Sequence, residues 1–139
     1  MKNQILQIKQ ISASEVLPIR QKVMWPNKPI EYVKLPNDES GEHFGLFLED
    51  KLISIISLFT KNGEAQFRKF ATLSEFQGGG YGTLLLKKIM DIAQSYGVNR
   101  IWCNARVEKS DFYKKFGLSP TNEQFQKGGI EYVIMEKVY

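Results

Sequence analysis

Two hydrophobic periodicities divide the chain. In much of the first half, hydrophobic and polar residues alternate, which is typical of strands with one face in the core. Further on, Leu85, Ile89 and Ile92 recur at helical spacing. They predict a helix over residues 81–96, ended by Gly97. We expect strands at about residues 4–11, 44–48, 52–59, 65–73, 98–104 and 130–138, and shorter helices at 14–24 and 110–116.

The order of these elements predicts the fold class. A strand, a glycine-rich turn, a helix and a second strand form a βαβ crossover, which pairs two parallel strands. The remaining strands follow one another closely, as antiparallel neighbours do. The sequence therefore predicts an α+β fold with a mixed, mostly antiparallel twisted sheet and a central βαβ crossover. Two segments outside these elements, residues 26–43 and 119–129, are expected to shape a binding cleft.

Composition narrows the class of protein further. The 139 residues fit one domain, and nine Phe, six Tyr and two Trp supply enough aromatic mass for a core. We find no apolar run long enough to cross a bilayer and no secretory signal, so the cytoplasm is the expected compartment. A single cysteine and a single histidine argue against a disulfide and a metal centre. The net charge of +4 is spread along the chain, which does not indicate a nucleic-acid partner.

The most informative segment is the glycine-rich turn before the long helix. Amide groups in the first turn of a helix lack internal partners, and together with the helix dipole they favour an anion such as phosphate. Four glycines within five positions, Gly78, Gly79, Gly80 and Gly82, exceed what a helix cap needs. The turn lacks the Gly-Lys-Ser/Thr of a P-loop, and Thr83 and Leu85 stand where a dinucleotide fingerprint requires its last glycine.

The turn instead matches the pattern Q/R-x-x-G-x-G/A through Gln77, Gly80 and Gly82. Downstream, the segment Asp111-Phe112-Tyr113-Lys114-Lys115-Phe116-Gly117-Leu118 is similar to an F-Y-x-K-x-G-F motif. On both motifs the chain resembles the GCN5-related N-acetyltransferase (GNAT) superfamily, from about residue 44 to 139 and more weakly before that. The resemblance implies one GNAT domain over residues 1–139, with helices flanking the sheet.

What the resemblance implies is transfer of an acetyl group from acetyl-CoA to an amine, by direct attack in a ternary complex. Tyr113 matches the general acid of the family, which protonates the departing thiolate or orients the sulfur. Many members carry an asparagine seven residues before this tyrosine; here that residue is Arg106, and Asn104 lies two residues earlier. The implied cofactor-binding residues are therefore Phe70, Ala71, Thr72, Gln77, Gly78, Gly79, Gly80, Tyr81, Gly82, Thr83, Asn104 and Arg106.

Several points stay open in the sequence. Arg68 and His43 are candidates for contacts with the acceptor, which is a small-molecule or peptide amine, and no single carboxylate stands out as a base. Cys103 lies in an apolar strand and fits a buried small residue better than a nucleophile. The rival functions are a catalytically inactive CoA-binding regulator and a small nucleic-acid-binding domain. Either a monomer or a homodimer suits the chain.

Overall fold

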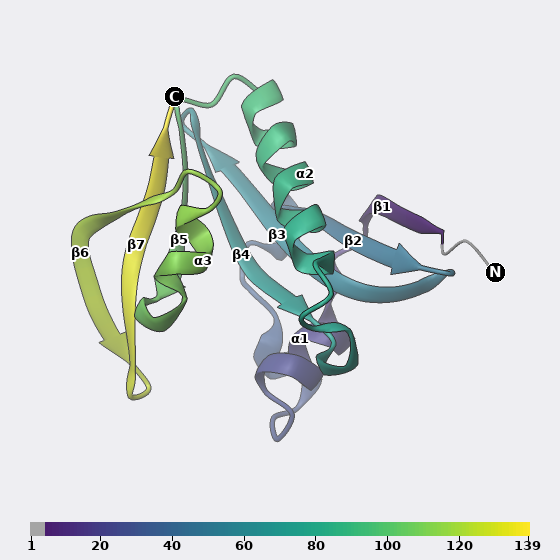
Figure 1. The fold of residues 1–139 in the computed structure, drawn as a ribbon. Coiled ribbons are helices and arrows are strands. Elements are labelled where there is room, and N and C mark those ends of the chain that lie inside the picture. The colour runs from purple at the N-terminus through teal and green to yellow at the C-terminus, as the bar shows by residue number, and fades with distance from the viewer. Residues whose placement is uncertain (1–4) are drawn as a thin grey trace.

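The computed structural model describes residues 5–139, and a seven-stranded sheet forms its centre (Figure 1). The strand order is β1-β2-β3-β4-β5-β7-β6. Neighbouring strands are antiparallel except β4 and β5, which are parallel and joined through helix α2. The elements are β1 (Leu6–Ile11), α1 (Leu17–Met24), β2 (Glu42–Leu48), β3 (Lys51–Lys61), β4 (Glu64–Thr72), α2 (Tyr81–Ser95), β5 (Arg100–Arg106), α3 (Ser110–Lys114), β6 (Ser119–Lys127) and β7 (Ile130–Val138), with short 3₁₀ turns at Ile30–Val33, Asp38–Ser40, Ser74–Phe76 and Val107–Lys109.

The helices cover the sheet from both sides. α2 and α3 lie on one face, and α1 packs on the other face against β3 and β4 (Figure 1). Leu85, Leu86 and Ile89 of α2 are fully buried with the apolar residues of β3. Each such side chain contributes about 1.5–3 kcal/mol relative to an exposed position. The predicted α+β class, the mixed sheet and the central crossover are confirmed.

The predicted element boundaries agree with the structure to within two residues, except at the start of α1. Ser12 and Glu15 form a capping box: the Ser12 amide donates to Glu15 Oε1 at 3.0 Å and the Glu15 amide donates to Ser12 Oγ at 3.3 Å. It closes a turn, however, and the helix begins later, at Leu17, with Pro18 in its first turn, where proline is tolerated. Residue 4 of the first predicted strand lies outside the described residues.

Strand β6 was not expected from the sequence. Residues 119–127 were expected to be an irregular tail, but they pair antiparallel with β7. Nearly all of them are exposed, because β6 is the last strand of the sheet and contacts the core little. Its sequence, SPTNEQFQK, carries no hydrophobic alternation that would distinguish it from a loop.

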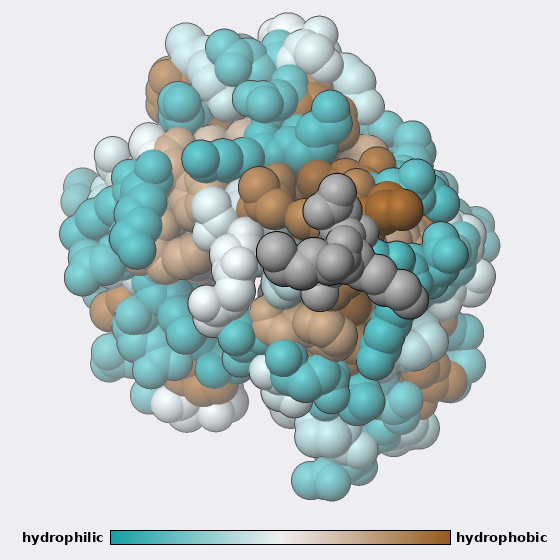
Figure 2. All heavy atoms as spheres, turned by 45° about the vertical axis from the view of Figure 1, so that its right-hand side comes forward, coloured by the Kyte–Doolittle hydropathy of each residue, from teal (hydrophilic) through white to brown (hydrophobic). Residues whose placement is uncertain are grey.

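The surface beside β1 is shown in Figure 2, where hydrophilic residues predominate and hydrophobic groups gather in separate patches. Leu6 and Leu84 are among the exposed hydrophobic residues, and with Ile8 and Leu46 they line a shallow hollow between β1 and α2. Scattered exposed hydrophobic residues are normal for a folded domain. Among residues 5–139, no helix is both long enough and apolar enough for a membrane crossing.

Candidate active site

The sheet opens between its two parallel strands. β4 and β5 pair only from Glu64 to Gln66 and from Arg100 to Trp102. Beyond these residues the strands diverge, and Figure 1 shows the gap widening toward the carboxyl ends of both. Because the pairing stops, the backbone of β4 from Phe67 onward has no β5 partner. Such an edge offers unpaired amide and carbonyl groups to an extended ligand.

A bulge in β4 lies at this opening. Ser57 of β3 pairs with Arg68 and Ile55 pairs with Ala71, so two β4 residues, Lys69 and Phe70, stand opposite Ile56 alone. Lys69 takes the left-handed conformation, with a φ of 55°, which is uncommon for a residue other than glycine. A bulge bends its strand and changes the direction of nearby groups. This bulge was not expected from the sequence.

The glycine turn forms an open cradle at the start of α2. Gly80 is the N-cap, with a φ of 85°, and no side chain caps the helix. Gly78 also has a positive φ, of 82°. A Cβ atom built at either position meets nothing within 4 Å, so both glycines border open space. Uncapped amides, the positive end of the helix dipole and glycines without side chains together fit a pyrophosphate.

The cradle is fixed to the end of β4. A Cβ atom at Gly82 would lie 3.1 Å from Phe70 Cζ and 3.3 Å from Thr72 Oγ1, so any larger residue would push these side chains away by a few tenths of an ångström. Gln77 Nε2 donates to the Thr72 carbonyl at 2.9 Å, which places the Gln77 side chain on the strand. Buried Ser54 donates to the Ala71 carbonyl at 3.1 Å and shares a 2.8 Å hydrogen bond with Thr72 Oγ1. Sequence reasoning missed Ser54, since its role depends on the register between β3 and β4.

Tyr113 lies on α3, on the same face of the sheet as α2. Its ring centroid is 5.9 Å from that of Phe67, where β4 begins to diverge from β5. The adjacent Phe112 stacks on Phe70 at 6.4 Å, so α3 packs beside the bulge. Burial raises the pKa of Tyr113, and nearby Cys103 raises it further, while the charge of Arg106 acts in the opposite direction. The phenol therefore remains protonated at neutral pH, as a proton donor must.

The two β5 candidates lie on the other side of the opening. Asn104 and Arg106 are exposed and pair with Ile134 and Tyr132 of β7. The guanidinium of Arg106 is close enough to lower the pKa of Tyr113, and it lies 3.8 Å from Glu108. The structure thus brings Arg106 near the predicted acid.

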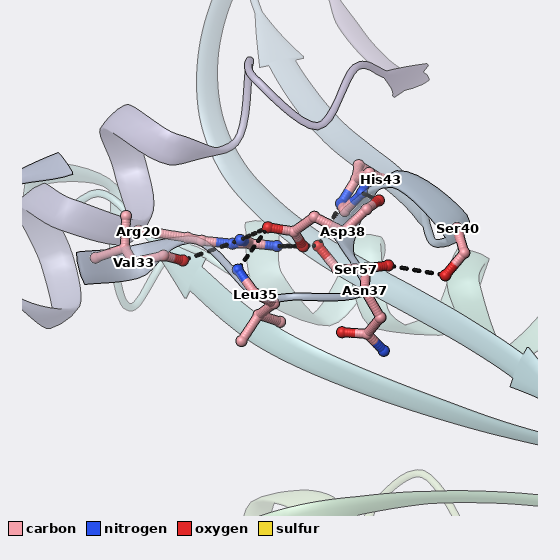
Figure 3. A network of polar contacts seen from close by, with 8 residues as sticks. All are labelled: Arg20, Val33, Leu35, Asn37, Asp38, Ser40, His43 and Ser57. Carbon is pink, nitrogen blue, oxygen red and sulfur yellow. Dashed lines mark hydrogen bonds and ion pairs between the residues drawn. The ribbon is translucent and has the colours of Figure 1, made fainter. Parts of the chain in front are cut away.

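His43 has a different place from the one expected. It is 3% exposed, and both ring nitrogens are occupied: Nδ1 lies 2.7 Å from Ser57 Oγ and Nε2 lies 2.8 Å from the Asp38 carbonyl (Figure 3). With neither nitrogen available, the geometry argues against the acceptor contact expected from the sequence. His43 instead joins the segment before β2 to β3.

The same network contains an ion pair that sequence reasoning missed. Arg20 of α1, fully buried, donates to both carboxylate oxygens of Asp38 at 2.8 and 2.9 Å, and also to Ser57 Oγ and the Val33 carbonyl (Figure 3). Burial acts to raise the pKa of Asp38, but the hydrogen bonds from Arg20 and the Leu35 amide outweigh it, so the pKa is lowered. From the sequence, Asp38 could not be distinguished from its exposed acidic neighbour Glu39. The sequence signal for a buried ion pair is Arg20 itself, which lies three residues after Leu17 on the apolar side of helix α1.

Cys103 lies inside the sheet, 3% exposed, and burial raises its pKa to about 12. A thiol in this state is unreactive, which agrees with the expected role as a buried small residue. In the described part of the chain, no cluster of three or more metal-binding side chains occurs.

Comparisons with known proteins agree with this geometry. Residues 21–139 match the family model "Acetyltransferase (GNAT) domain". The chain is 32% identical to YitI, an uncharacterised N-acetyltransferase of Bacillus subtilis, over 96% of both chains. The fold is similar to that of Escherichia coli ElaA (TM-score 0.81, 16% identity, 96% of this chain and 99% of that one). It is also similar to a GNAT family acetyltransferase from Elizabethkingia anophelis solved with acetyl-CoA bound (TM-score 0.74, 17% identity, 96% and 98%).

The seven-stranded sheet of this chain, which opens beside the glycine turn, thus has the GNAT fold. The chain belongs to the GNAT family of acetyltransferases. It is an acyltransferase.

Proposed function

We propose that this protein transfers the acetyl group of acetyl-CoA to an amine. The observation that carries the proposal is the convergence of three features at one opening: the unpaired edge of β4, the uncapped glycine turn and the partly buried phenol of Tyr113. Membership of the GNAT family supports the reaction class. The Elizabethkingia relative, which holds acetyl-CoA, supports the donor.

Acetyl-CoA supplies an activated thioester and an anionic pyrophosphate. We assign the pyrophosphate to the amides of the glycine cradle, because they combine positive potential with space for the ligand. The backbone of Phe70, Ala71 and Thr72 would pair with the extended arm of the ligand as a further strand does. The Gln77 side chain holds the cradle on β4. Arg106, on the β5 side of the opening, adds positive charge there.

Tyr113 is the proposed general acid. When the amine attacks the thioester carbonyl, an N–C bond forms and the C–S bond breaks, and Tyr113 gives its proton to the departing sulfur. The raised pKa keeps this proton in place beforehand. A backbone amide at the β4 bulge can donate to the carbonyl oxygen as charge develops on it. Tyr113 then recovers a proton from solvent.

The acceptor must react as a neutral amine, because an ammonium ion has no lone pair. Asp38 is the one buried carboxylate residue in residues 5–139, and its ion pair with Arg20 withdraws it from proton transfer. We therefore propose that solvent water at the opening accepts the proton that the amine loses. The rate should rise with pH until the free amine predominates, and we expect this rise in initial rates measured against pH.

The donor is tested by calorimetric titration of the purified protein with acetyl-CoA, with ATP and NAD as controls. We expect binding of acetyl-CoA alone, since ATP and NAD have phosphates but no arm to pair with β4. A panel of amines is then screened by release of CoA. Equal binding of all three nucleotides, or none after mass spectrometry has excluded a co-purified ligand, would contradict the proposal.

The acid is tested by Tyr113→Phe, which removes the hydroxyl and keeps the aromatic packing on Phe67. We expect kcat to fall by about 10²–10⁴-fold, the range of general acid catalysis, with the affinity for acetyl-CoA nearly unchanged. Tyr96→Phe, at an exposed tyrosine of α2's carboxyl end, is the matched control and should retain full activity. Full activity in Tyr113→Phe would show that the acid assignment is wrong.

A further inference from the structure

We propose that the acceptor amine carries an anionic group, a carboxylate or a phosphate, and that Arg68, Lys69 and Lys127 recognise it. This inference rests on the proposed function, because it concerns the acceptor of the same reaction. It follows from the position of three cations beside the opening in the sheet, and from the charges around them.

Arg68 lies on the face of the sheet away from the cofactor cradle. Neighbouring residues of a strand point to opposite faces. Phe67 contacts Tyr113 on the α3 side, whereas Arg68 pairs in register with Ser57, whose hydroxyl bonds Arg20 of α1. Arg68 therefore lies on the α1 side, where β4 has just separated from β5. An amine that approaches the thioester from the α1 side of the sheet passes Arg68.

Lys69 occupies the bulge itself. A left-handed conformation is unfavourable for an ordinary side chain, and a glycine or asparagine there would avoid most of that cost. Strained residues of this kind gather at functional sites. The half-buried Lys69 feels the charges of Arg68 and Arg20, and also that of Lys127 at the end of β6. The charges of Arg68, Arg20 and Lys127 therefore place Lys69 in an electropositive environment.

The positive charge at this position is not balanced within residues 5–139. Asp38 is the one carboxylate with an electrostatic effect on Arg68 and Lys69. Both terminal guanidinium nitrogens of Arg20 already bind it. Neither Arg68 nor Lys69 takes part in an ion pair of the described residues. Residues 1–4 contain no acidic side chain. Burial and then the neighbouring cations lower the pKa of Lys69, in keeping with the lack of an ion-pair partner beside it.

Half-buried like charges destabilise a protein unless a ligand of opposite sign compensates them. The phosphates of the donor are assigned to α2, on the other face of the sheet, and so would not serve here. The acceptor is the remaining source of negative charge in the reaction. A carboxylate or phosphate on it would neutralise the three cations and orient its amine toward the opening.

The probes are three amines of similar size: β-alanine carries a carboxylate, 2-aminoethyl phosphate carries a phosphate, and β-alaninamide carries neither. Each is titrated into protein saturated with CoA, and binding is followed by the ¹⁵N and side-chain NMR signals of the protein. We expect the signals of Arg68, Lys69 and Lys127 to move with at least one anionic probe, at an affinity about tenfold or more above that of the amide. The two anionic arms distinguish carboxylate from phosphate.

Two variants, Arg68→Gln and Lys69→Gln, test the residues. Each should reduce the affinity for the anionic probe about tenfold, leave the affinity for acetyl-CoA unchanged, and keep or raise the melting temperature, because an uncompensated charge is removed. A merely structural role would lower the melting temperature instead. Lys61→Gln, at an exposed lysine at the far end of β3, is the control and should change none of these.

The inference is overturned if the amide binds as well as both anionic probes, or if the anionic probes leave the three signals in place. If acetyl-CoA binds normally in these cases, only the inference fails and the proposed function stands. If calorimetry shows no binding of acetyl-CoA, both fail.

Discussion

Arg20 and Asp38 join three parts of the chain that are distant in sequence: α1, the segment before β2, and Ser57 of β3. A buried ion pair contributes little compared with apolar packing, but removal of one partner leaves the other charge without compensation. The pair therefore holds the segment before β2 on the sheet. The ion pair fixes one arrangement of that segment beside Arg68.

For this reason Asp38→Ala should lower the free energy of unfolding by about 3–5 kcal/mol at neutral pH. The folded pKa of Asp38 is lowered, so its contribution is complete above the ordinary aspartate pKa of about 3.9 and is lost as the pH falls toward the folded value. The difference between variant and wild type should shrink in acid. Urea unfolding at neutral and acidic pH measures both effects.

The exposed neighbour Glu39 offers the matched control, and Glu39→Ala should change stability by less than about 0.5 kcal/mol. An Asp38→Ala protein as stable as the control would contradict the assignment of a buried, compensated pair.

Single residues differ in how far the sequence predicts them. Tyr113 and the glycines of the turn belong to local motifs, so the sequence alone singles them out, and their roles stay predictions. Lys69 and Ser54 have no such motif. The bulge at Lys69 and the hydrogen bonds of Ser54 exist only in the register between β3 and β4, which pairing across the sheet determines.

At the scale of elements, α2 combines two roles. Its buried side places Leu85 and Ile89 in the core, and its uncapped first turn faces the opening. The hydrophobic periodicity that predicted the helix follows from its packing in the core. The glycines before the helix belong to its second role, at the opening. β6 and the start of α1 show the limit of this reasoning, since a polar edge strand and a capped turn before a helix carry no distinctive period.

Gly80→Asp should disrupt the second role alone. The substitution places a negative side chain at the helix N-terminus, in the space assigned to the pyrophosphate, and we expect the affinity for acetyl-CoA to fall by roughly tenfold or more. Calorimetry measures this loss. Gly97→Asp has the same left-handed backbone and the same open surroundings, at the other end of α2. If both variants lose affinity equally, strain in the helix and not the cradle is responsible.

The molecule as a whole is a sheet with an unfilled gap between β4 and β5. The predicted class and crossover describe most of this architecture. The place of β7 between β5 and β6 was not predicted, because that order depends on pairing between distant segments. The gap is also a non-local property: both strands are regular in sequence, and only their divergence after three pairs creates the site.

A ligand that bridges the two strands should stabilise the whole fold. With acetyl-CoA at a hundred times its Kd, linkage gives about 2.7 kcal/mol. For a domain of this size the melting temperature should rise by roughly 5–10 °C. Differential scanning fluorimetry measures the shift, which Gly80→Asp should largely abolish at the same concentration. No rise in the wild-type protein at saturating acetyl-CoA would contradict this use of the gap.

The burial of Cys103 has a practical consequence. It is the only cysteine of the chain, and with its pKa at about 12 it contains almost no thiolate at the pH of an assay. Disulfide reagents react with thiolates, so the native protein should be nearly silent toward them. The CoA set free by each acetyl transfer then supplies the one thiol that such a reagent registers. A chromogenic disulfide reagent can accordingly record turnover continuously through its absorbance, without any change to the enzyme.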